Sequence, residues 1–278
     1  MPSFTTPNPI TATLTTAGAK VRIAASERSD TVVRVEPLDG TNKTDVKVAE
    51  KTKVDFTDGE LSIKTTKSGD KNGSVAITIE VPAGSGLVLN TGWTDVHAYG
   101  PLGDCELNTS SGQVQIDRVT ALRGNLAAGG IAIGHVAGDV AIEGGTAGVR
   151  IGEVEGTVRY SGSSAQVWIG RARSVLALES SGGAFDIDRA DDDVTVKTGD
   201  SPIRIGRLTR GLADLTNAAG GIEVGISDGS TASVDAKSTK GTVRNSLSAQ
   251  HQPGESGAAV KVIARTRLDD IVIHRVAS

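Results

Sequence analysis

The chain has 278 residues, of which 37% are hydrophobic and 3% aromatic, and its formal net charge is −4. This weak acidic charge gives no reason to expect nucleic acid or an anionic membrane as a partner. The single cysteine, Cys105, excludes an internal disulfide and a cysteine-rich metal site. Because residues 1–16 have no basic or apolar segment and no run approaches about 18 apolar residues, we expect a cytoplasmic protein without a signal peptide or transmembrane segment.

Residues 1–85 contain short stretches in which apolar and polar residues alternate. They read "KVRIAA" (20–25), "TVVRVEPL" (31–38), "DVKVAE" (45–50), "KVDFTDGELSIKTT" (53–66) and "VAITIEVP" (75–82). A period of two predicts β-strands, and no segment predicts a helix. We interpret residues 1–85 as an antiparallel β-cap that covers the first of the repeats that follow.

Residues 86–247 repeat a phrase of nine residues. The pieces "GVRIGEVEG", "TVRYSGSSA" and "QVWIGRARS" fill residues 148–174, and each has apolar residues at its second and fourth places. Two kinds of piece alternate, so the full period is 18, as the isoleucines show: Ile133, Ile151, Ile169, Ile187 and Ile205. Such self-similarity predicts a solenoid in which each coil has two short strands and lies on the next coil at about 4.8 Å.

The repeat also explains the composition, because about four apolar side chains per coil would meet in a thin interior. A single coil cannot offset the entropy of ordering its own residues, so the coils must stabilise one another. Glycines such as Gly134, Gly152, Gly170 and Gly206 follow the inward isoleucine and open a turn. We expect this position to favour a positive φ.

Residues 248–278 complete the chain. The segment "HQPGESG" (251–257) predicts a loop, and "AAVKVIARTRLDDIVIHRVA" (258–277) predicts two capping strands. Caps are expected because the open end of a solenoid is an edge that invites pairing between molecules. The predicted fold is therefore all-β: a single-stranded parallel β-solenoid with 18-residue coils, an N-terminal antiparallel cap and C-terminal capping strands.

Three segments carry a resemblance to a known family. They are "VPAGSGLVLNTGWTDV" (81–96), "LNTSSGQVQID" (107–117) and "STKGTVRNSL" (238–247) with the terminal strands "VKVIARTRLDDIVIHR" (260–275). The chain resembles the bacterial β-strand-repeat family known as "putative adhesins", a group of domains of unknown function. The resemblance implies a repeat fold and an adhesin-like role, with many relatives tethered to a membrane or associated with the cell surface.

Acidic residues near one turn raise the question of catalysis. Asp186 and Asp188 lie on one side of a predicted strand, about 7 Å apart by strand rise, which is compatible with a glycosidase pair. The alternative interpretation, which we prefer, is that Asp188 replaces the turn glycine. The histidines show no ligand spacing, and Cys105 occupies an inward position. We therefore expect no catalytic residue, no metal site and no cofactor.

Basic residues recur two places after the inward isoleucines. This column reads Arg118, His135, Glu153, Arg171, Arg189 and Arg207. It indicates either a strip that binds an anion or a partner, or a solvated ladder neutralised by nearby aspartates. The candidate interaction surface consists of Trp168, Arg171, Arg189, Arg204 and Arg207.

These observations favour a non-enzymatic scaffold or binding module. One alternative is a structural protein that self-assembles into filaments, and another is a glycan-active β-helical enzyme. We expect a protein partner or self-association, with a glycan as an alternative, and neither nucleic acid nor membrane insertion.

Overall fold

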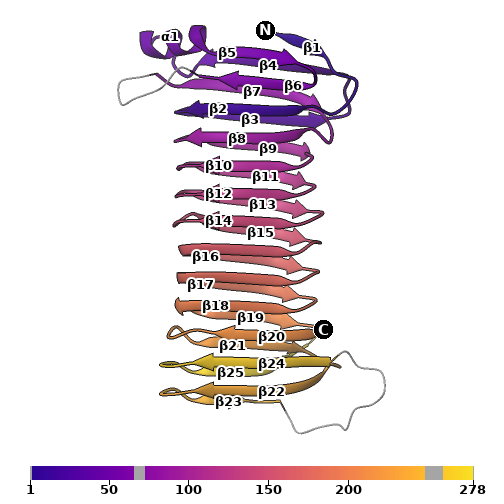
Figure 1. Cartoon of the computed structure of the whole chain (residues 1–278), viewed down its shortest axis with the longest axis vertical. Helices are drawn as coiled ribbons and strands as arrows, with labels where there is room; N and C mark the ends of the chain where they lie inside the picture. Colours follow the sequence, from indigo (N-terminus) through magenta and orange to yellow (C-terminus); the bar gives the residue numbers. More distant parts are fainter. Residues whose placement is uncertain (1, 66–72, 248–258, 278) are drawn as a thin grey trace. The chain divides into compact units, whose positions relative to one another are not determined.

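The computed structural model describes residues 2–65, 73–247 and 259–277, which form 25 strands and one helix (Figure 1). Strands make up nearly all of the regular structure of these residues, so the predicted all-β class is confirmed. The chain divides into two compact units, Met1–Ala137 and Gly138–Ser278. The predicted boundaries after residues 85 and 247 stay predictions.

The first unit is built from thirteen strands and the helix. Their bounds are β1 (Ser3–Thr5), β2 (Thr11–Ala17), β3 (Ala19–Ser26), β4 (Asp30–Pro37), α1 (Lys43–Lys51), β5 (Lys53–Thr57), β6 (Glu60–Lys64), β7 (Val75–Pro82), β8 (Gly86–Gly92), β9 (Asp95–Pro101), β10 (Cys105–Thr109), β11 (Gln113–Val119), β12 (Leu122–Leu126) and β13 (Gly130–Val136). Parallel pairing orders them in two rows, β6-β2-β8-β10-β12 and β7-β3-β9-β11-β13. Apolar residues alternate toward the interior between these rows.

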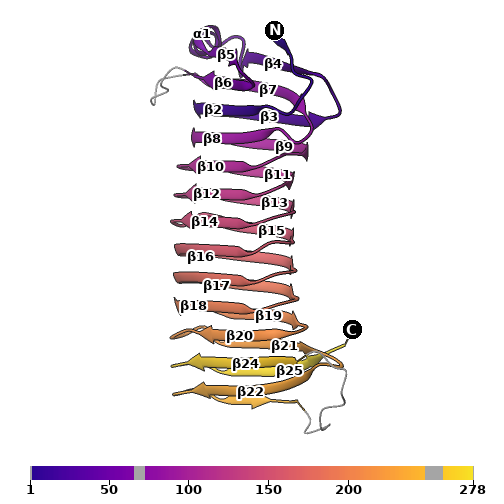
Figure 2. The ribbon, with the colours of Figure 1, turned by 45° about the vertical axis from the view of Figure 1, so that its right-hand side comes forward.

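The prediction of a purely antiparallel cap over residues 1–85 is wrong. Strands β1, β4 and β5 do pair antiparallel, on β4, β7 and β6 respectively. Strands β2 and β3, however, are parallel to both of their neighbours and lie between β6/β7 and β8/β9 (Figure 2). The N-terminal coil is thus inserted one layer inside the unit, which an antiparallel meander would not allow.

The segment predicted as the strand "DVKVAE" forms helix α1 instead. Asn42 caps the helix by accepting a hydrogen bond from the N–H of Thr44. The buried Asp45 carboxylate accepts the N–H of Asp39 at 2.9 Å and that of Ser74 at 2.8 Å. These bonds tie the helix to the chain just beyond β4 and just before β7.

The second unit contains the remaining twelve strands. Their bounds are β14 (Val140–Gly144), β15 (Gly148–Val154), β16 (Val158–Ala172), β17 (Leu176–Ala190), β18 (Val194–Asp200), β19 (Ile203–Leu208), β20 (Gly211–Thr216), β21 (Ile222–Ser227), β22 (Thr231–Ser238), β23 (Val243–Asn245), β24 (Ala259–Thr266) and β25 (Ile271–Val276). Strands β16 and β17 are long because each runs through two successive repeat phrases without a break. Parallel pairing again makes two rows of strands, one through β18 and β20 and the other through β19 and β21.

Isoleucines at the same place in successive repeats lie side by side inside this unit. Ile151 lies beside Ile169, Ile169 beside Ile187, and Ile187 beside Ile205, each step spanning 18 residues. All four side chains are fully buried. Beyond them the step lengthens, because Ile205 pairs with Val224, 19 residues on. The interior is therefore a file of aliphatic side chains supplied by adjacent strands.

The two C-terminal strands do not cap the stack as predicted. Strand β24 pairs with β20 on one side and β22 on the other, and β25 pairs with β21 and β23. The last coil of the chain thus lies inside, and the outermost described strands are β22 and β23 (Figure 1). The predicted loop at 251–257 lies outside the described residues.

The turn glycines are required for close packing rather than for their φ angles. A Cβ at Gly170 would lie 2.5 Å from the carbonyl oxygen of Gly152, and one at Gly206 would lie 2.8 Å from that of Asp188. Neither glycine has a positive φ, so the expectation of left-handed backbone is wrong at these places. The glycines instead let one coil approach the backbone of the previous coil.

Candidate functional site

The outer face of the row β15-β16-β17-β19 carries a file of large polar and aromatic side chains. Parallel register places Arg150 beside Trp168, Trp168 beside Asp186, and Asp186 beside Arg204. The Arg150 guanidinium lies 4.6 Å from the centroid of the Trp168 ring, a cation–π contact. Arg204 Nη1 lies 2.5 Å from Asp186 Oδ1 and 3.2 Å from Asp188 Oδ1. We call Arg150, Trp168, Asp186 and Arg204 the tryptophan file.

A second file lies further along the same strands, where two outward residues occur in succession. In β16 the buried residues are Val167, Ile169 and then Ala172, so Gly170 and Arg171 both face outward. Arg171 lies beside Glu153 in β15 and Arg189 in β17. Gly170 lies close to the backbone of the previous coil, and Arg171 follows it on the surface.

The arginines of the second file converge on one carboxylate. Asp191 accepts bonds from Arg171 Nη2 at 2.8 Å, Arg189 Nε at 2.7 Å and Thr209 Oγ1 at 3.1 Å. The side chain of Asp191 is 13% exposed. Burial by itself would raise its pKa, but the hydrogen bonds from Arg189, Arg171 and Thr209 outweigh burial and lower the pKa below its ordinary value.

We expect Asp191→Asn to destabilise the fold by about 1–2 kcal/mol at pH 7, because it removes a charged group that accepts hydrogen bonds from three side chains. A carboxyl whose pKa is lowered by folding stabilises the protein above its unfolded pKa of about 3.9, and this contribution is lost as the pH falls through the lower folded value. The difference between wild type and variant should therefore shrink below about pH 4. Urea unfolding at several pH values measures it.

The exposed Asp228 supplies the control for this experiment. Asp228→Asn should change the free energy of unfolding by less than about 0.5 kcal/mol at either pH. A constant penalty for Asp191→Asn at all pH values would contradict the assigned ion pairs.

A shallow depression of about 320 Å³ lies over the second file. Its lining is Arg171, Arg173, Arg189, Asp191, Thr209 and Arg210. The positive charges are matched locally, since Arg173 pairs with Glu153 at 2.7 Å and Arg210 with Asp192 at 3.5 Å. The depression therefore offers many hydrogen-bond donors without a large excess of positive charge.

The five residues of the predicted interaction surface do not form one continuous cluster. Trp168 and Arg204 belong to the tryptophan file, and Arg171 and Arg189 belong to the second file. The guanidinium of Arg207 donates instead to the carbonyl of Ala277, near the C-terminal strand. The period of 18 was sufficient to align the arginines, but it gave no sign that Asp191 would hold two of them together.

Two residues singled out as potential chemistry have structural surroundings. Cys105 is buried, and burial raises the pKa of its thiol to about 12, so the thiolate that a nucleophile requires is not formed at neutral pH. Asp186 and Asp188 share the guanidinium of Arg204. Among the described residues, no group of three or more His, Cys, Asp or Glu side chains could hold a metal ion.

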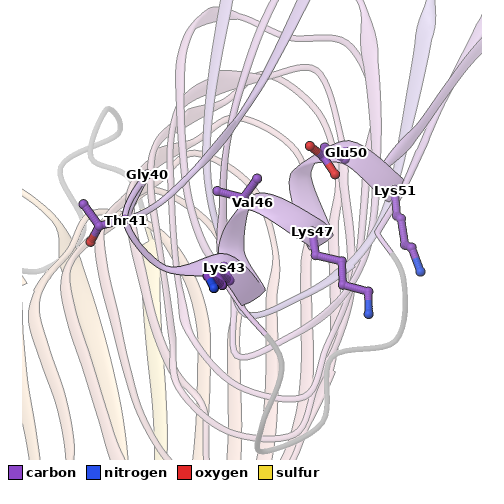
Figure 3. A pocket seen from close by; sticks show the side chains of 7 residues that line it. All are labelled: Gly40, Thr41, Lys43, Val46, Lys47, Glu50 and Lys51. Carbon is purple, nitrogen blue, oxygen red and sulfur yellow. The ribbon is translucent and has the colours of Figure 1, made fainter.

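The first unit has surface features that the sequence analysis did not single out. A depression of about 470 Å³ lies against α1, where Lys43, Lys47 and Lys51 recur every four residues (Figure 3). In Figure 3, Lys47 and Lys51 extend away from the same side of the helix. Elsewhere in the unit, the Arg22 guanidinium lies 5.1 Å from the centroid of the exposed Tyr99 ring. The spacing of four residues brings these lysines to one face only in a helix, whereas the sequence predicted a strand here.

Trp93 has an unusual backbone conformation as well as an exposed ring. Its φ is +45°, and its side chain is 69% exposed in the turn between β8 and β9. The Thr94 hydroxyl donates to the carbonyl of Gly92 at 2.9 Å and so bridges this turn. A positive φ is costly for a bulky residue, and the neighbouring bonds hold the turn in that shape.

Comparison with known proteins gives a family and a set of similar solved structures, which includes the following three. A "putative cell adhesion protein" from Clostridium sporogenes is 10% identical, with 99% of this chain and 98% of that chain covered and a TM-score of 0.21. A "putative adhesin" from Bacteroides fragilis is 12% identical, with 98% and 95% covered and a TM-score of 0.36. A "putative lipid binding protein" from Parabacteroides distasonis is 12% identical, with 99% and 95% covered and a TM-score of 0.42.

No curated protein matches the sequence. In the described part of the chain, no helix has the length and apolar character needed to cross a membrane. The profile of the Toastrack DUF4097 family matches residues 12–273, which confirms the resemblance to a β-strand-repeat family of unknown function. This chain belongs to the Toastrack DUF4097 family.

Proposed function

We propose that the protein is a non-enzymatic, adhesin-like binding module built on parallel coils of 18 residues. Its contact surface consists of the tryptophan file together with Arg171 and Arg189, without Arg207, whose guanidinium donates to the carbonyl of Ala277. The observation that carries the proposal is the register of this face: adjacent strands of one sheet present Arg150, Trp168, Asp186 and Arg204 side by side. A hydrogen-bonded sheet holds such side chains at fixed spacing, so little conformational entropy is lost on binding.

The charges of this face favour a protein partner over a polyanion. Arg171, Arg173, Arg189, Arg204 and Arg210 are each paired with an aspartate or glutamate. A polyanion would have to displace these carboxylates, whereas a protein surface can add groups of both signs. Tryptophan and arginine are also the residue types that supply much of the binding energy in protein interfaces. The cytoplasmic location expected from the sequence stays a prediction.

The same ion pairs argue against the alternative of a glycan-active enzyme. A glycosidase needs one carboxyl that donates a proton and one carboxylate that acts as base or nucleophile. Asp186 and Asp188 share one guanidinium. Both carboxylates accept hydrogen bonds from Arg204, as expected for side chains that position this arginine in the tryptophan file.

A binding experiment with matched variants tests the contact surface. Wild type, Trp168→Ala and Arg159→Ala are immobilised and exposed to an extract of the source cells that includes the membrane fraction. Arg159 is exposed on the first part of β16, which belongs to the other row of strands. We expect the proteins captured by wild type and by Arg159→Ala to bind Trp168→Ala at least tenfold more weakly, a loss of about 1.4 kcal/mol or more.

Equal capture by all three proteins would show that the tryptophan file is not the contact surface. Hydrolysis of a glycan by wild type that disappears in Asp186→Asn would overturn the non-enzymatic proposal. Circular dichroism of each variant shows whether the fold is intact.

A further inference from the structure

The second unit ends in an open sheet edge. Strand β22 pairs with β24 on one side, and within the described residues no strand pairs with its other side. Its inward side chains Ala232, Val234 and Ala236 are half-buried, whereas their neighbours Val260, Val262 and Ala264 on β24 are buried. The described strands thus leave one layer of the apolar interior partly open to solvent.

Natural sheet edges usually carry features that prevent pairing between molecules, such as proline, a bulge or an inward-pointing charge. Strand β22 has none of these. Its sequence is TASVDAKS, its register on β24 runs unbroken from Thr231 to Ser238, and its charged residues, Asp235 and Lys237, occupy outward positions. The first unit, by contrast, covers its outermost parallel strands with β5 and β4.

The direction of the backbone groups follows from one bond at the end of the strand. The N–H of Thr239 donates to the carbonyl of Thr266, beyond the last pair of β22 and β24. Backbone N–H groups alternate in direction along a strand, so those of the odd-numbered residues face β24. The N–H and C=O groups of Val234, Ala236 and Ser238 therefore face the open edge.

We propose that this edge pairs with β22 of a second copy of the chain, antiparallel and about a two-fold axis at Ala236. Ala236 then lies opposite Ala236 of the second copy, and Val234 lies opposite Ser238 of that copy. Both are pairs that exchange hydrogen bonds, because their backbone groups face the edge. The contact is self-complementary and closed, so it makes a dimer and does not continue into a filament.

The charged side chains of β22 favour this register over the registers with the axis one residue earlier or later. With the axis at Ala236, Asp235 lies opposite Lys237 of the second copy in a non-hydrogen-bonded pair, where side chains are closest. Asp235 also pairs with Arg265 of its own chain, at 2.5 Å, so Lys237 of the second copy would add a second cation to this carboxylate. Moving the axis to Asp235 would place two aspartates opposite each other, and moving it to Lys237 would place two lysines opposite each other. Like charges directly opposite are destabilising, so only the register at Ala236 pairs both charges favourably.

Sedimentation velocity over about 10 µM to about 1 mM tests the proposal, because a short edge contact gives a modest affinity. We expect wild type to approach twice the chain mass of 28.4 kDa as its concentration rises. Ala236→Pro removes an N–H that faces only the edge, a position where a sheet tolerates proline, and it should abolish the dimer while thermal unfolding of the monomer stays unchanged.

Substitutions of Lys237 provide the matched control, because Asp235 is already tied to Arg265 of its own chain. Lys237→Asp should weaken dimerisation at least tenfold, and Lys237→Arg should keep it within about threefold of wild type. Three outcomes would overturn the proposal: wild type that stays monomeric at about 1 mM, a dimer that survives Ala236→Pro, or rods of many copies in electron microscopy. None of these outcomes bears on the tryptophan file, so this proposal and the binding surface stand or fall separately.

Discussion

Ile151→Asp should unfold the second unit or destabilise it by at least about 4 kcal/mol, because it buries a charge without a partner. The Ile151 side chain is fully buried and lies beside Ile169 in the aliphatic file. An aspartate there could not reach water without separating β15 from β16. Urea unfolding followed by circular dichroism measures the loss.

Arg150→Asp is the control, one position away in the same strand. Arg150 is exposed, and its main contact is with the Trp168 ring. Losing that contact should cost less than about 1 kcal/mol. Similar effects from the two substitutions would show that the inward and outward faces of β15 are wrongly assigned.

Gly183→Ala should strongly destabilise β17, with an expected loss of at least about 3 kcal/mol in the free energy of unfolding. A Cβ at Gly183 would lie 1.8 Å from the carbonyl oxygen of Ala165, and the φ angle of Gly183 is +108°. Both the backbone conformation and the contact therefore exclude a side chain. The shift in the midpoint of thermal unfolding measures the effect.

The adjacent Gly182 makes a matched pair with Gly183. Its Cβ would make only ordinary van der Waals contacts, the shortest at 3.5 Å to the side chain of Ser164, and its φ is not positive. Gly182→Ala should be neutral or stabilise slightly, because alanine reduces the entropy of the unfolded chain. A large loss in Gly182→Ala, or none in Gly183→Ala, would contradict the turn between the two halves of β17.

The core of the repeat region could be predicted because residues that contact each other there are separated by one repeat length in the sequence. Residues at the same place in successive repeats, such as Val167 and Phe185, become neighbours in parallel strands. The period therefore identifies both the inward face and the contacts across it. Few folds give so direct a relation between sequence position and spatial neighbour.

The order of the terminal coils could not be predicted in this way. Strands β2 and β24 have the same alternation of apolar and polar residues as the other strands. Nothing in their own sequences specifies that β2 lies between β6 and β8, or that β24 lies between β20 and β22. Pairing of an apolar strand depends on which edges are free during folding. Alternation alone gives the inward face but not the neighbour.

Helix α1 was missed for a different reason. Val46 and Val48 alternate with charged residues, which indicates a strand, but the segment also contains local helix signals. Asn42 precedes it as a cap, Asp45 lies in the first turn and Lys51 in the last. Capping and end charges were better guides here than a short alternation.

The candidate site was predicted to the extent that it follows the repeat. Arg171 and Arg189 are neighbours because they share a repeat position. Asp191 joins them from a turn, and Arg207 leaves them for Ala277. These side-chain contacts depend on the geometry of a turn and on the position of the C-terminal residues. A repeat pattern gives no information about either.

The central claim is that like residues of successive coils stack in a buried file, and isoleucine methyl NMR tests it most directly. In a protein labelled at its isoleucine methyl groups and assigned by Ile→Val variants, we expect nuclear Overhauser contacts from Ile151 to Ile169, from Ile169 to Ile187 and from Ile187 to Ile205. We expect no contact between Ile151 and Ile205, since three strand spacings of about 4.8 Å separate them. Absence of the three neighbour contacts, or broadening of these methyl signals by a soluble paramagnetic probe, would contradict the stacked coils.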